Sequence, residues 1–338
     1  MVSKNIQKVL QRQHYGLFGK NKHSAVQICL WNKNSLNDKG VCWKEKFYGI
    51  KSHRCCQMTP AVMYCQNKCL HCWRAIEYNL GTKILKIDEP KEIIEGAIEA
   101  RKKLLSGFKG NKNVSEKKFK ESLEPTLFTF SLSGEPTLYP KLSELISLVR
   151  KRKAISFLVT NGLNPKAIKK LEKENSLPTQ ITLSTNAPNK ELFKMWHNSS
   201  EKNAWKKFNE TLLILNRLNG KTRRVIRLTL VKGIKGKKFV DGLTNMKDEH
   251  IQEYAKLIKK ANPDVIPIKG YTDVGFAKKR MGYEKEPWHN EIKVFAQKLR
   301  KELNNKKEVY KTLGEDKKSR VVILGKSKAR MKIKKSEI

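Results

Sequence analysis

The chain has 338 residues, 38% of them hydrophobic, so it is long enough to fold around one large core or two smaller ones. Its 72 Lys and Arg residues against 32 Asp and Glu give a net charge of +40, which indicates a polyanionic partner and nucleic acid first, although a general bias towards Lys would also explain it. No apolar run of about 18 residues and no signal-peptide pattern occur, so we expect a cytoplasmic protein without a membrane span.

The first third of the chain gives few helix or strand signals. Residues 1–23 are basic with a weak helical stripe, and we expect a surface helix or arm. Residues 24–59 carry several cysteines between short pieces of structure, which predicts a loop-rich insertion. The apolar residues 60–64 predict the first strand, which would end at a cysteine-rich loop.

After this strand, strand patterns and helix patterns alternate. Strands are predicted at 127–132, 155–159, 180–184, 224–231 and 265–268. Helices are predicted at 90–105, 140–149, 165–174, 205–218, 249–261 and 288–303, with a lysine-rich loop at 109–120. A hairpin within 309–324 and a basic tail follow.

This alternation predicts an α/β fold with a parallel sheet and helices outside it. About six β-then-α units fall short of a closed eight-fold barrel, so we expect a partial (β/α)6 barrel of the TIM type with N-terminal and C-terminal additions. The expected domains are an extension at 1–59 that carries a second cysteine set, the partial barrel at 60–305, and a hairpin with a basic tail at 306–338. In such sheets the chemistry collects at the C-terminal ends of the strands.

Cys65, Cys69 and Cys72 form a C-x₃-C-x₂-C triplet directly after the first predicted strand. Three thiolates from one short loop suit three irons of a [4Fe–4S] cluster and leave the fourth iron free. The alternative is a zinc site completed by His71 or His53, but zinc sites usually take paired ligands from two separate loops, and the second pair is missing.

Cys29, Cys42 and Cys55 form a second, wider triplet, C-x₁₂-C-x₁₂-C. Equal wide spacing requires three separate turns that converge on one object, as a second cluster with an open iron would need. Three buried structural cysteines are the alternative. Cys56 is expected to be buried and not to bind metal.

Small polar residues follow three successive predicted strands: Ser133-Gly134-Glu135-Pro136, Thr160-Asn161-Gly162 and Ser184-Thr185-Asn186. A carboxylate and free backbone carbonyls suit an ammonium partner. Each segment alone is an ordinary turn sequence. Their position at successive strand ends makes them candidates for one binding site.

With the compact triplet after its first strand, the chain resembles the radical S-adenosylmethionine (SAM) superfamily. The resemblance implies that Cys65, Cys69 and Cys72 hold the cluster that binds SAM. It also implies that Gly134, Glu135 and Pro136 hold the methionine amino group of SAM, and that Asn161, Ser184 and Asn186 contact its ribose or carboxylate.

The double cysteine pattern is similar to that of the archaeal tRNA-modifying 4-demethylwyosine synthases, as are the segments 42–50, 65–74 and 269–275. This resemblance implies a carbon–carbon lyase with two [4Fe–4S] clusters and SAM. Its substrates would be pyruvate and tRNA-Phe that carries N1-methylguanosine at position 37. A SAM-derived radical would abstract hydrogen from the N1-methyl group, and the methylene radical would add to the pyruvate carbonyl.

Pyruvate could bind the open iron at Cys29, Cys42 and Cys55, or form a Schiff base with a lysine. Of the nearby lysines the resemblance favours Lys44. Only 28 residues precede Cys29, so we expect no flavodoxin-like domain, an external electron donor such as a flavodoxin or ferredoxin, and a monomer.

Basic segments are candidates for tRNA phosphate contacts: 109–120, 221–224, 235–238, 278–280 and 326–335. Trp73, Tyr271 and Trp196 are candidates for stacking on the target base. The alternatives are another two-cluster radical SAM enzyme that modifies RNA, and a zinc-containing RNA-binding protein.

Overall fold

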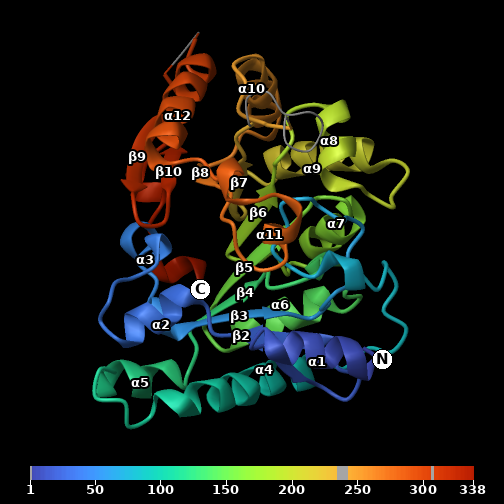
Figure 1. Ribbon diagram of the computed structural model, residues 1–338, viewed down its shortest axis with the longest axis vertical. Coiled ribbons are helices and arrows are strands. Elements are labelled where there is room, and N and C mark those ends of the chain that lie inside the picture. The colour runs from blue at the N-terminus through green and yellow to red at the C-terminus, as the bar shows by residue number, and fades with distance from the viewer. Residues whose placement is uncertain (1, 234–242, 306–307) are drawn as a thin grey trace.

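A single ten-stranded mixed sheet runs through the computed structural model, which describes residues 2–233, 243–305 and 308–338 (Figure 1). The strands are β1 Gly16–Phe18, β2 Ser24–Gln27, β3 Cys55–Thr59, β4 Leu127–Phe130, β5 Ile155–Thr160, β6 Gln180–Ser184, β7 Arg223–Leu230, β8 Val265–Gly270, β9 Lys311–Asp316 and β10 Val321–Gly325. Strands β3 to β8 are parallel and neighbours in chain order. Strands β1 and β2 extend one edge, and β10 and β9 the other, all antiparallel.

Helices cover the outer face of the parallel strands. The helices are α1 Lys4–Arg12, α2 Leu30–Leu36, α3 Trp43–Tyr48, α4 Pro90–Leu105, α5 Glu116–Ser122, α6 Leu142–Lys151, α7 Pro165–Lys173, α8 Lys190–His197, α9 Ala204–Arg217, α10 Glu249–Ala261, α11 Ala277–Arg280 and α12 His289–Leu303. The apolar stripes of α4, α6, α7, α9, α10 and α12 bury alternate strand residues such as Ile226, Leu228 and Ile266. This alternation leaves the other side chains of each strand on the inner face.

The inner face has its own apolar cluster at the N-terminal ends of the strands. Phe157 and Val225 pack there against Trp43 and Tyr48 of α3 and against Met331 near the C-terminus. In Figure 1, α3 and the C-terminus lie to the left of the strands, and α7 and α9 lie to the right. We call the inner face of the parallel strands, from this cluster to their C-terminal ends, the lumen.

The α/β class, five of the six parallel strands and most of the predicted helices are confirmed. The first parallel strand was predicted wrongly: it is Cys55–Thr59, and 60–64 is a loop in which Tyr64 N bonds Ala61 O and Met63 adopts a positive φ of 67°. Residues 24–59 hold more regular structure than expected. Strand β2 pairs with β3, and the short helices α2 and α3 lie between these two strands in the chain. The predicted loop 109–120 ends in α5, and α8 was missed.

The N-terminal segment is also more tightly packed than a surface arm. Ile6 and Leu10 of α1 are buried against Val62 and Leu132, beside the strand ends. None of the helices in the described residues has the length and apolarity needed to cross a membrane.

Candidate functional site

The loop that carries Cys65, Cys69 and Cys72 lies beyond the C-terminal end of β3 and is fixed by backbone hydrogen bonds from distant segments. Cys65 N donates to Gly81 O at 2.9 Å, and Leu70 N donates to Trp196 O at 3.0 Å. The end of α8 therefore holds the loop that the sequence placed after the first strand.

Arg280 at the end of α11 binds the same loop through its carbonyl oxygens. Its Nε donates to Leu70 O at 3.1 Å, and its Nη2 donates to Arg74 O at 3.2 Å and to Cys72 O. Glu77 pairs with the other Nη of the guanidinium. Since these carbonyls lie around the third cysteine, Arg280 fixes the direction in which the Cys72 side chain leaves the loop.

The three thiols of the compact triplet share one enclosed space. Cys72 raises the pKa of Cys65 and of Cys69, and Cys65 also raises that of Cys69. Burial is the largest cause for all three and raises the pKa of Cys65 to about 12. Such thiols lose their protons only when a cation replaces them. All three are free of disulfides.

Three thiols from one short loop can each bind a different iron of a [4Fe–4S] cluster. Within the described part of the chain, no three His, Cys, Asp or Glu side chains are placed to bind one metal ion together. In a [4Fe–4S] cluster each thiolate binds a different iron, so the sulfurs lie further apart. His71 is unavailable as a fourth ligand in this arrangement, since Trp196 Nε1 donates to its Nδ1 and Asn186 Nδ2 lies 3.2 Å from its Nε2.

The segment Ser133–Pro136 packs directly against the loop that leads to Cys65. Glu135 N donates to Tyr64 O at 2.7 Å, and a Cβ on Gly134, whose φ is +72°, would lie 1.9 Å from Ala61 O. Only glycine fits there. The predicted SAM-binding residues Gly134, Glu135 and Pro136 are thus brought beside the triplet.

The Glu135 carboxylate is buried and already accepts several hydrogen bonds. Its Oε1 accepts from the hydroxyls of Thr137 and Thr160, both at 2.7 Å, and its Oε2 accepts from Asn161 N at 2.8 Å. Burial raises the pKa of Glu135, and these hydrogen bonds oppose the rise. The carboxylate therefore ties two strand ends together, and only part of it remains open to a ligand.

The other predicted SAM contacts lie at the same ends of β5 and β6. Asn161 Nδ2 lies 3.1 Å from Gln66 Oε1 and 3.6 Å from Cys65 Sγ. Ser184 Oγ accepts from Arg227 Nη2 at 2.7 Å. Asn186 contacts His71 and leaves its Oδ1 buried without a partner among the described residues. An unpaired buried carbonyl is a position where a ligand donor is favourable.

Cys29, Cys42 and Cys55 converge at the opposite end of β3. Cys29 directly precedes α2, Cys42 directly precedes α3, and Cys55 is the first residue of β3, with its Sγ 3.6 Å from Thr129 Oγ1. Burial and the other two cysteines raise the pKa of Cys29 to about 12. The three turns that the wide spacing required are present. Cys56 is buried on the outer face, as predicted.

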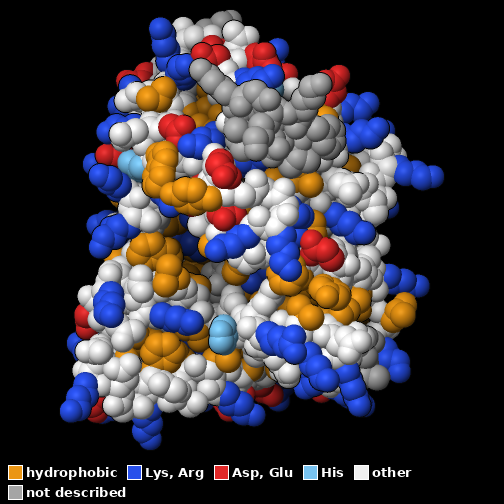
Figure 2. Space-filling view, viewed as in Figure 1, with side chains coloured by type: hydrophobic (Ala, Val, Ile, Leu, Met, Phe, Trp, Pro, Cys, Tyr) orange, Lys and Arg blue, Asp and Glu red, His pale blue; other side chains and the backbone are white. Residues whose placement is uncertain are grey.

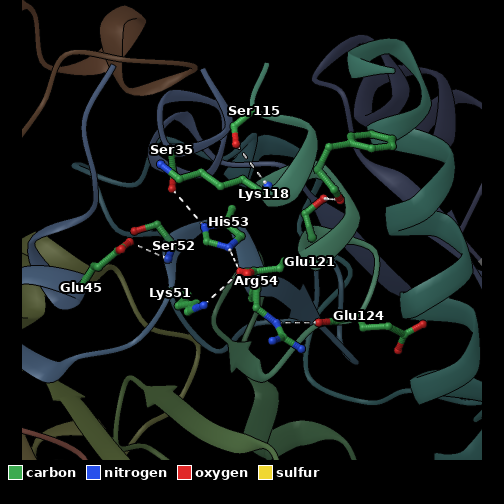
Figure 3. Close-up of polar contacts among 12 residues, drawn as sticks. Ser35, Glu45, Lys51, Ser52, His53, Arg54, Ser115, Lys118, Glu121 and Glu124 are labelled. Atoms are coloured by element: carbon green, nitrogen blue, oxygen red, sulfur yellow. Dashed lines mark hydrogen bonds and ion pairs between the residues drawn. The ribbon is translucent and has the colours of Figure 1, made fainter. Parts of the chain in front are cut away.

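Side chains from four segments hold the turn before Cys55 (Figure 3). The buried His53 bonds Glu121 Oε2 at 2.7 Å through Nε2 and lies 3.3 Å from Ser35 Oγ through Nδ1. A neutral ring that donates from Nε2 and accepts at Nδ1 satisfies both contacts. Lys51 also bonds Glu121, at 3.0 Å, and the two contacts lower the pKa of Glu121 to about 2.

Two buried side chains bind the backbone of the same turn. Asn32 Nδ2 donates to Ser52 O at 3.0 Å and to Cys55 O at 3.1 Å. Arg101 donates to His53 O at 2.6 Å and to Cys55 O at 3.3 Å. Cys55 is thus positioned by α2 and α4 as well as by its own strand.

Three cations line the lumen between the two triplets, and the sequence indicated only one of them. Lys44 Nζ lies 5.5 Å from the ring centroid of Phe157, an inner-face residue. Lys269 and Arg227 are on the inner faces of β8 and β7. Burial lowers the pKa of Lys269 to about 8. The positive charges of Arg227 and Lys44 also lower this pKa, and Cys42 raises it. The signal that was missed is a charged residue at an inward position of a predicted buried strand.

The basic segments predicted to bind tRNA have different environments. Arg223 and Arg224 are buried and pair with Glu337 and Asp264, so they are structural, and the prediction for them was wrong. Arg280 binds the cluster loop, as described above. Residues 235–238 lie outside the described residues. Other Lys and Arg side chains are spread over the face shown in Figure 2, especially along its margin.

Of the three aromatic residues considered for base stacking, only Trp73 is open to a ligand. Its ring is 39% exposed, and the Arg74 guanidinium lies over it, 3.1 Å from the centroid. Trp196 is fully buried, and Tyr271 is buried with its hydroxyl bonded to Asp273.

Comparisons with known proteins agree on one family. The model of the Radical SAM superfamily matches residues 61–258, and the model of Wyosine base formation matches residues 260–326. An S-adenosyl-L-methionine-dependent tRNA 4-demethylwyosine synthase from Pyrococcus horikoshii is 40% identical over 301 residues, 89% of this chain and 83% of the relative. A relative of the same name from Methanocaldococcus jannaschii is 36% identical over 331 residues, 96% of each chain. A solved structure of TYW1 with a lysine–pyruvate adduct bound has a TM-score of 0.79 and 33% identity, and the match covers 96% of this chain and 97% of that one.

Proposed function

Because this chain belongs to the radical SAM tRNA 4-demethylwyosine synthases, we propose that it condenses pyruvate with N1-methylguanosine at position 37 of tRNA-Phe. Membership makes the protein a SAM-dependent enzyme of wyosine formation with a [4Fe–4S] cluster. The two substrates, the second cluster and the residue roles below are the proposed part.

The observation that carries the proposal is the placement of two cysteine triplets at the two ends of β3, with lysines of the lumen between them. A structure with 33% identity contains a lysine–pyruvate adduct, which supports a lysine as the group that binds pyruvate. Lys44 is our choice, because it is the second residue of α3, two positions after Cys42, and reaches the inner face at Phe157.

The cluster at Cys65, Cys69 and Cys72, together with SAM, supplies one-electron cleavage that yields an organic radical. The chain's own residues position the reactants around that event. Gly134, Glu135 and Asn161 fix the cluster loop against the strand ends where SAM would bind. Lys44 would attack the pyruvate ketone and form an imine with loss of water, which requires its neutral form.

The role proposed for the triplet Cys29, Cys42 and Cys55 is to hold a second [4Fe–4S] cluster at the far end of the lumen. An open iron there would supply a Lewis acid next to Lys44, since the thiols of Cys29 and Cys42 lie within electrostatic reach of this lysine. An external donor such as a flavodoxin or ferredoxin, and a monomeric enzyme, belong to the same proposal.

The net charge of +40 supports recruitment of tRNA through its phosphates. The target base lies in a loop, so it can leave its stack and enter the mouth of the lumen. Trp73, exposed directly after the third cysteine, is the aromatic side chain best placed to meet it.

The test is a reconstituted anaerobic reaction with tRNA-Phe that carries N1-methylguanosine, SAM, a reductant and ¹³C-labelled pyruvate. We expect a nucleoside with the mass of the tricyclic base and the label of two pyruvate carbons. A reconstituted enzyme that cleaves SAM but incorporates no pyruvate carbon would contradict the proposal.

A further inference from the structure

The walls of the lumen carry more positive charge than the proposed chemistry has used. Lys44 has a role as the imine-forming residue, but Arg227 and Lys269 have none. Neither of these two side chains forms an ion pair with an acidic side chain anywhere in the described residues. Asp316, whose charge acts to raise the pKa of Lys269, binds Lys46 at 2.7 Å instead.

Arg227 presents an unused donor to the lumen. Its Nη2 donates to Ser184 Oγ at 2.7 Å, which fixes the plane of the guanidinium. Its Nε is buried and has no hydrogen-bond partner in the described chain. A buried guanidinium N–H without an acceptor costs free energy unless a ligand accepts its hydrogen bond. A carboxylate oxygen suits this donor because a hydrogen bond between two charged groups is stronger than a neutral one.

Lys269 lies on the same wall as Arg227. In the register of β7 with β8, Lys269 is opposite Thr229, two residues from Arg227 and on the same face of the sheet. No hydrogen bond from Lys269 Nζ to a described residue is found. The ammonium is within electrostatic reach of both Cys42 and Lys44, so it points towards the second triplet.

The two cations therefore lie between the two triplets. Arg227 is linked to the compact triplet, because it bonds Ser184, and Asn186 two residues further on contacts His71 of the cysteine loop. Lys269 is linked to the wide triplet through Cys42. A small anion held by both would sit where Lys44 can reach it.

We infer that Arg227 and Lys269 bind the carboxylate of the 2-oxo acid substrate and present its ketone carbon to Lys44. This inference rests on the proposed function, which supplies the 2-oxo acid. The competing ligand is the methionine carboxylate of SAM. The 2-oxo acid is favoured because Lys44, the proposed imine-forming residue, lies within electrostatic reach of Lys269.

The experiment traps the imine with borohydride and measures the added mass by intact-protein mass spectrometry, over a range of pyruvate concentrations. The variants are Arg227→Gln and Lys269→Gln, with Arg227→Lys and Lys269→Arg as charge-preserving forms. We expect the half-saturating pyruvate concentration to rise about tenfold or more in each Gln variant, because each variant loses one hydrogen bond from a charged donor to the carboxylate. Arg217→Gln, which removes an exposed charge on α9, should change nothing.

The uncharged probe methyl pyruvate separates carboxylate binding from a general defect. The wild-type enzyme should trap pyruvate at lower concentration than methyl pyruvate, and the Gln variants should lose this preference while trapping methyl pyruvate as the wild type does. SAM cleavage to 5′-deoxyadenosine should keep its KM for SAM. If a Gln variant contains less iron than the wild type, the charge-preserving variant at the same position replaces it in the comparison. The half-saturating pyruvate concentration of that variant should rise less than expected for the Gln variant.

Three results would overturn the inference. Unchanged pyruvate trapping in both Gln variants would remove any role in binding the acid. A raised KM for SAM with normal pyruvate trapping would assign the site to the methionine carboxylate. Loss of trapping in Lys269→Gln but not in Lys44→Ala would make Lys269 the imine-forming residue. Failure of the proposed function is distinct: the wild-type enzyme would then incorporate no pyruvate carbon.

Discussion

Arg280 Nε donates to the carbonyl oxygen of Leu70 at 3.1 Å, across 210 positions of the chain. The same guanidinium also bonds the carbonyls of Cys72 and Arg74, so one side chain of α11 binds three points of the cluster loop. The loop is short and carries all three ligands of the compact triplet. Its geometry therefore depends on the last third of the chain.

Arg280→Gln should loosen the compact triplet without unfolding the protein. A planar amide has too few donors to bind three carbonyls, and hydrogen bonds from a charged donor contribute about 1.5–3 kcal/mol each. We expect less iron after reconstitution and faster cluster loss under oxygen, measured by iron analysis and visible absorbance. Lys278→Gln, an exposed position of the same helix, is the matched control and should keep its iron. Equal iron content in both variants would show that Arg280 does not support the loop.

Glu121→Gln should weaken the wide triplet selectively. The variant replaces the charged acceptor of His53 and Lys51 by an amide, so the turn before Cys55 loses part of its support. We expect partial loss of one cluster signal in electron paramagnetic resonance of the reduced protein, while the signal that responds to SAM stays. Glu116→Gln, exposed on the same helix, serves as the control. Loss of the SAM-responsive signal instead would contradict this assignment.

Lys44→Ala should retain both clusters and still cleave SAM, yet form no tricyclic base. The aliphatic replacement removes the amine that would form an imine but touches no cysteine. Product nucleoside and 5′-deoxyadenosine are measured in the same reaction, and Lys39→Ala, exposed in the same segment, should behave as wild type. Borohydride trapping of pyruvate at wild-type levels in Lys44→Ala would exclude this residue.

Asp264→Asn should lower the free energy of unfolding by about 3 kcal/mol, because it leaves the fully buried Arg224 without its ionic partner. Burial opposes ionisation of Asp264, but the hydrogen bonds from Arg224 prevail and lower its pKa. A lowered carboxyl pKa stabilises the fold above the ordinary Asp range, and this stabilisation is lost as the pH falls through the lowered value. The difference between wild type and variant should therefore shrink in acid.

Thermal unfolding under anaerobic conditions at several pH values measures this effect. Asp248→Asn is the matched control, because its carboxylate is exposed and pairs with Lys298 only at the surface. A melting temperature equal to wild type in Asp264→Asn at neutral pH would show that the buried pair contributes little.

Binding of tRNA should weaken strongly with salt. If the excess of Lys and Arg contacts phosphates, the affinity should fall at least about tenfold between 50 and 200 mM salt, because bound counterions are released on association. Fluorescence anisotropy with labelled tRNA-Phe measures it. A flat response would mean that the charge is a property of composition alone.

The sequence predicted the repeated units well, because each later strand is a short apolar run between turn signals and each helix has a clear apolar stripe. The sequence-based prediction missed strand β3, because Cys55-Cys56-Gln57-Met58-Thr59 is not a continuous apolar run. Its side chains alternate between polar and apolar, but this alternation indicates a strand only if the inner face of the sheet is known to be polar. The apolar segment 60–64 was chosen instead, although it packs as a loop against Gly134 and α1.

The cysteine ligands could be identified because their spacing is a local property. Arg227 and Lys269 could not, because charged residues are usually exposed, and only the register of β7 and β8 shows that these two lie on the inner face. The roles of Arg280 and Glu121 depend on contacts between residues far apart in the sequence. Such contacts leave no pattern in a single chain.

Strand β3 begins with Cys55 and leads within a few residues to the loop of Cys65, and it is hydrogen-bonded on both sides, to β2 and β4. The separation between the two proposed metal centres is therefore set by the interior strand Cys55–Thr59 and by the loop 60–64, which packs against Gly134 and α1. Inserting or deleting one residue in the strand would turn Cys55 to the outer face and move Cys65 along the strand axis at the same time. Neither centre can be shifted independently, so the distance over which the radical and its acceptor meet is a property of the sheet.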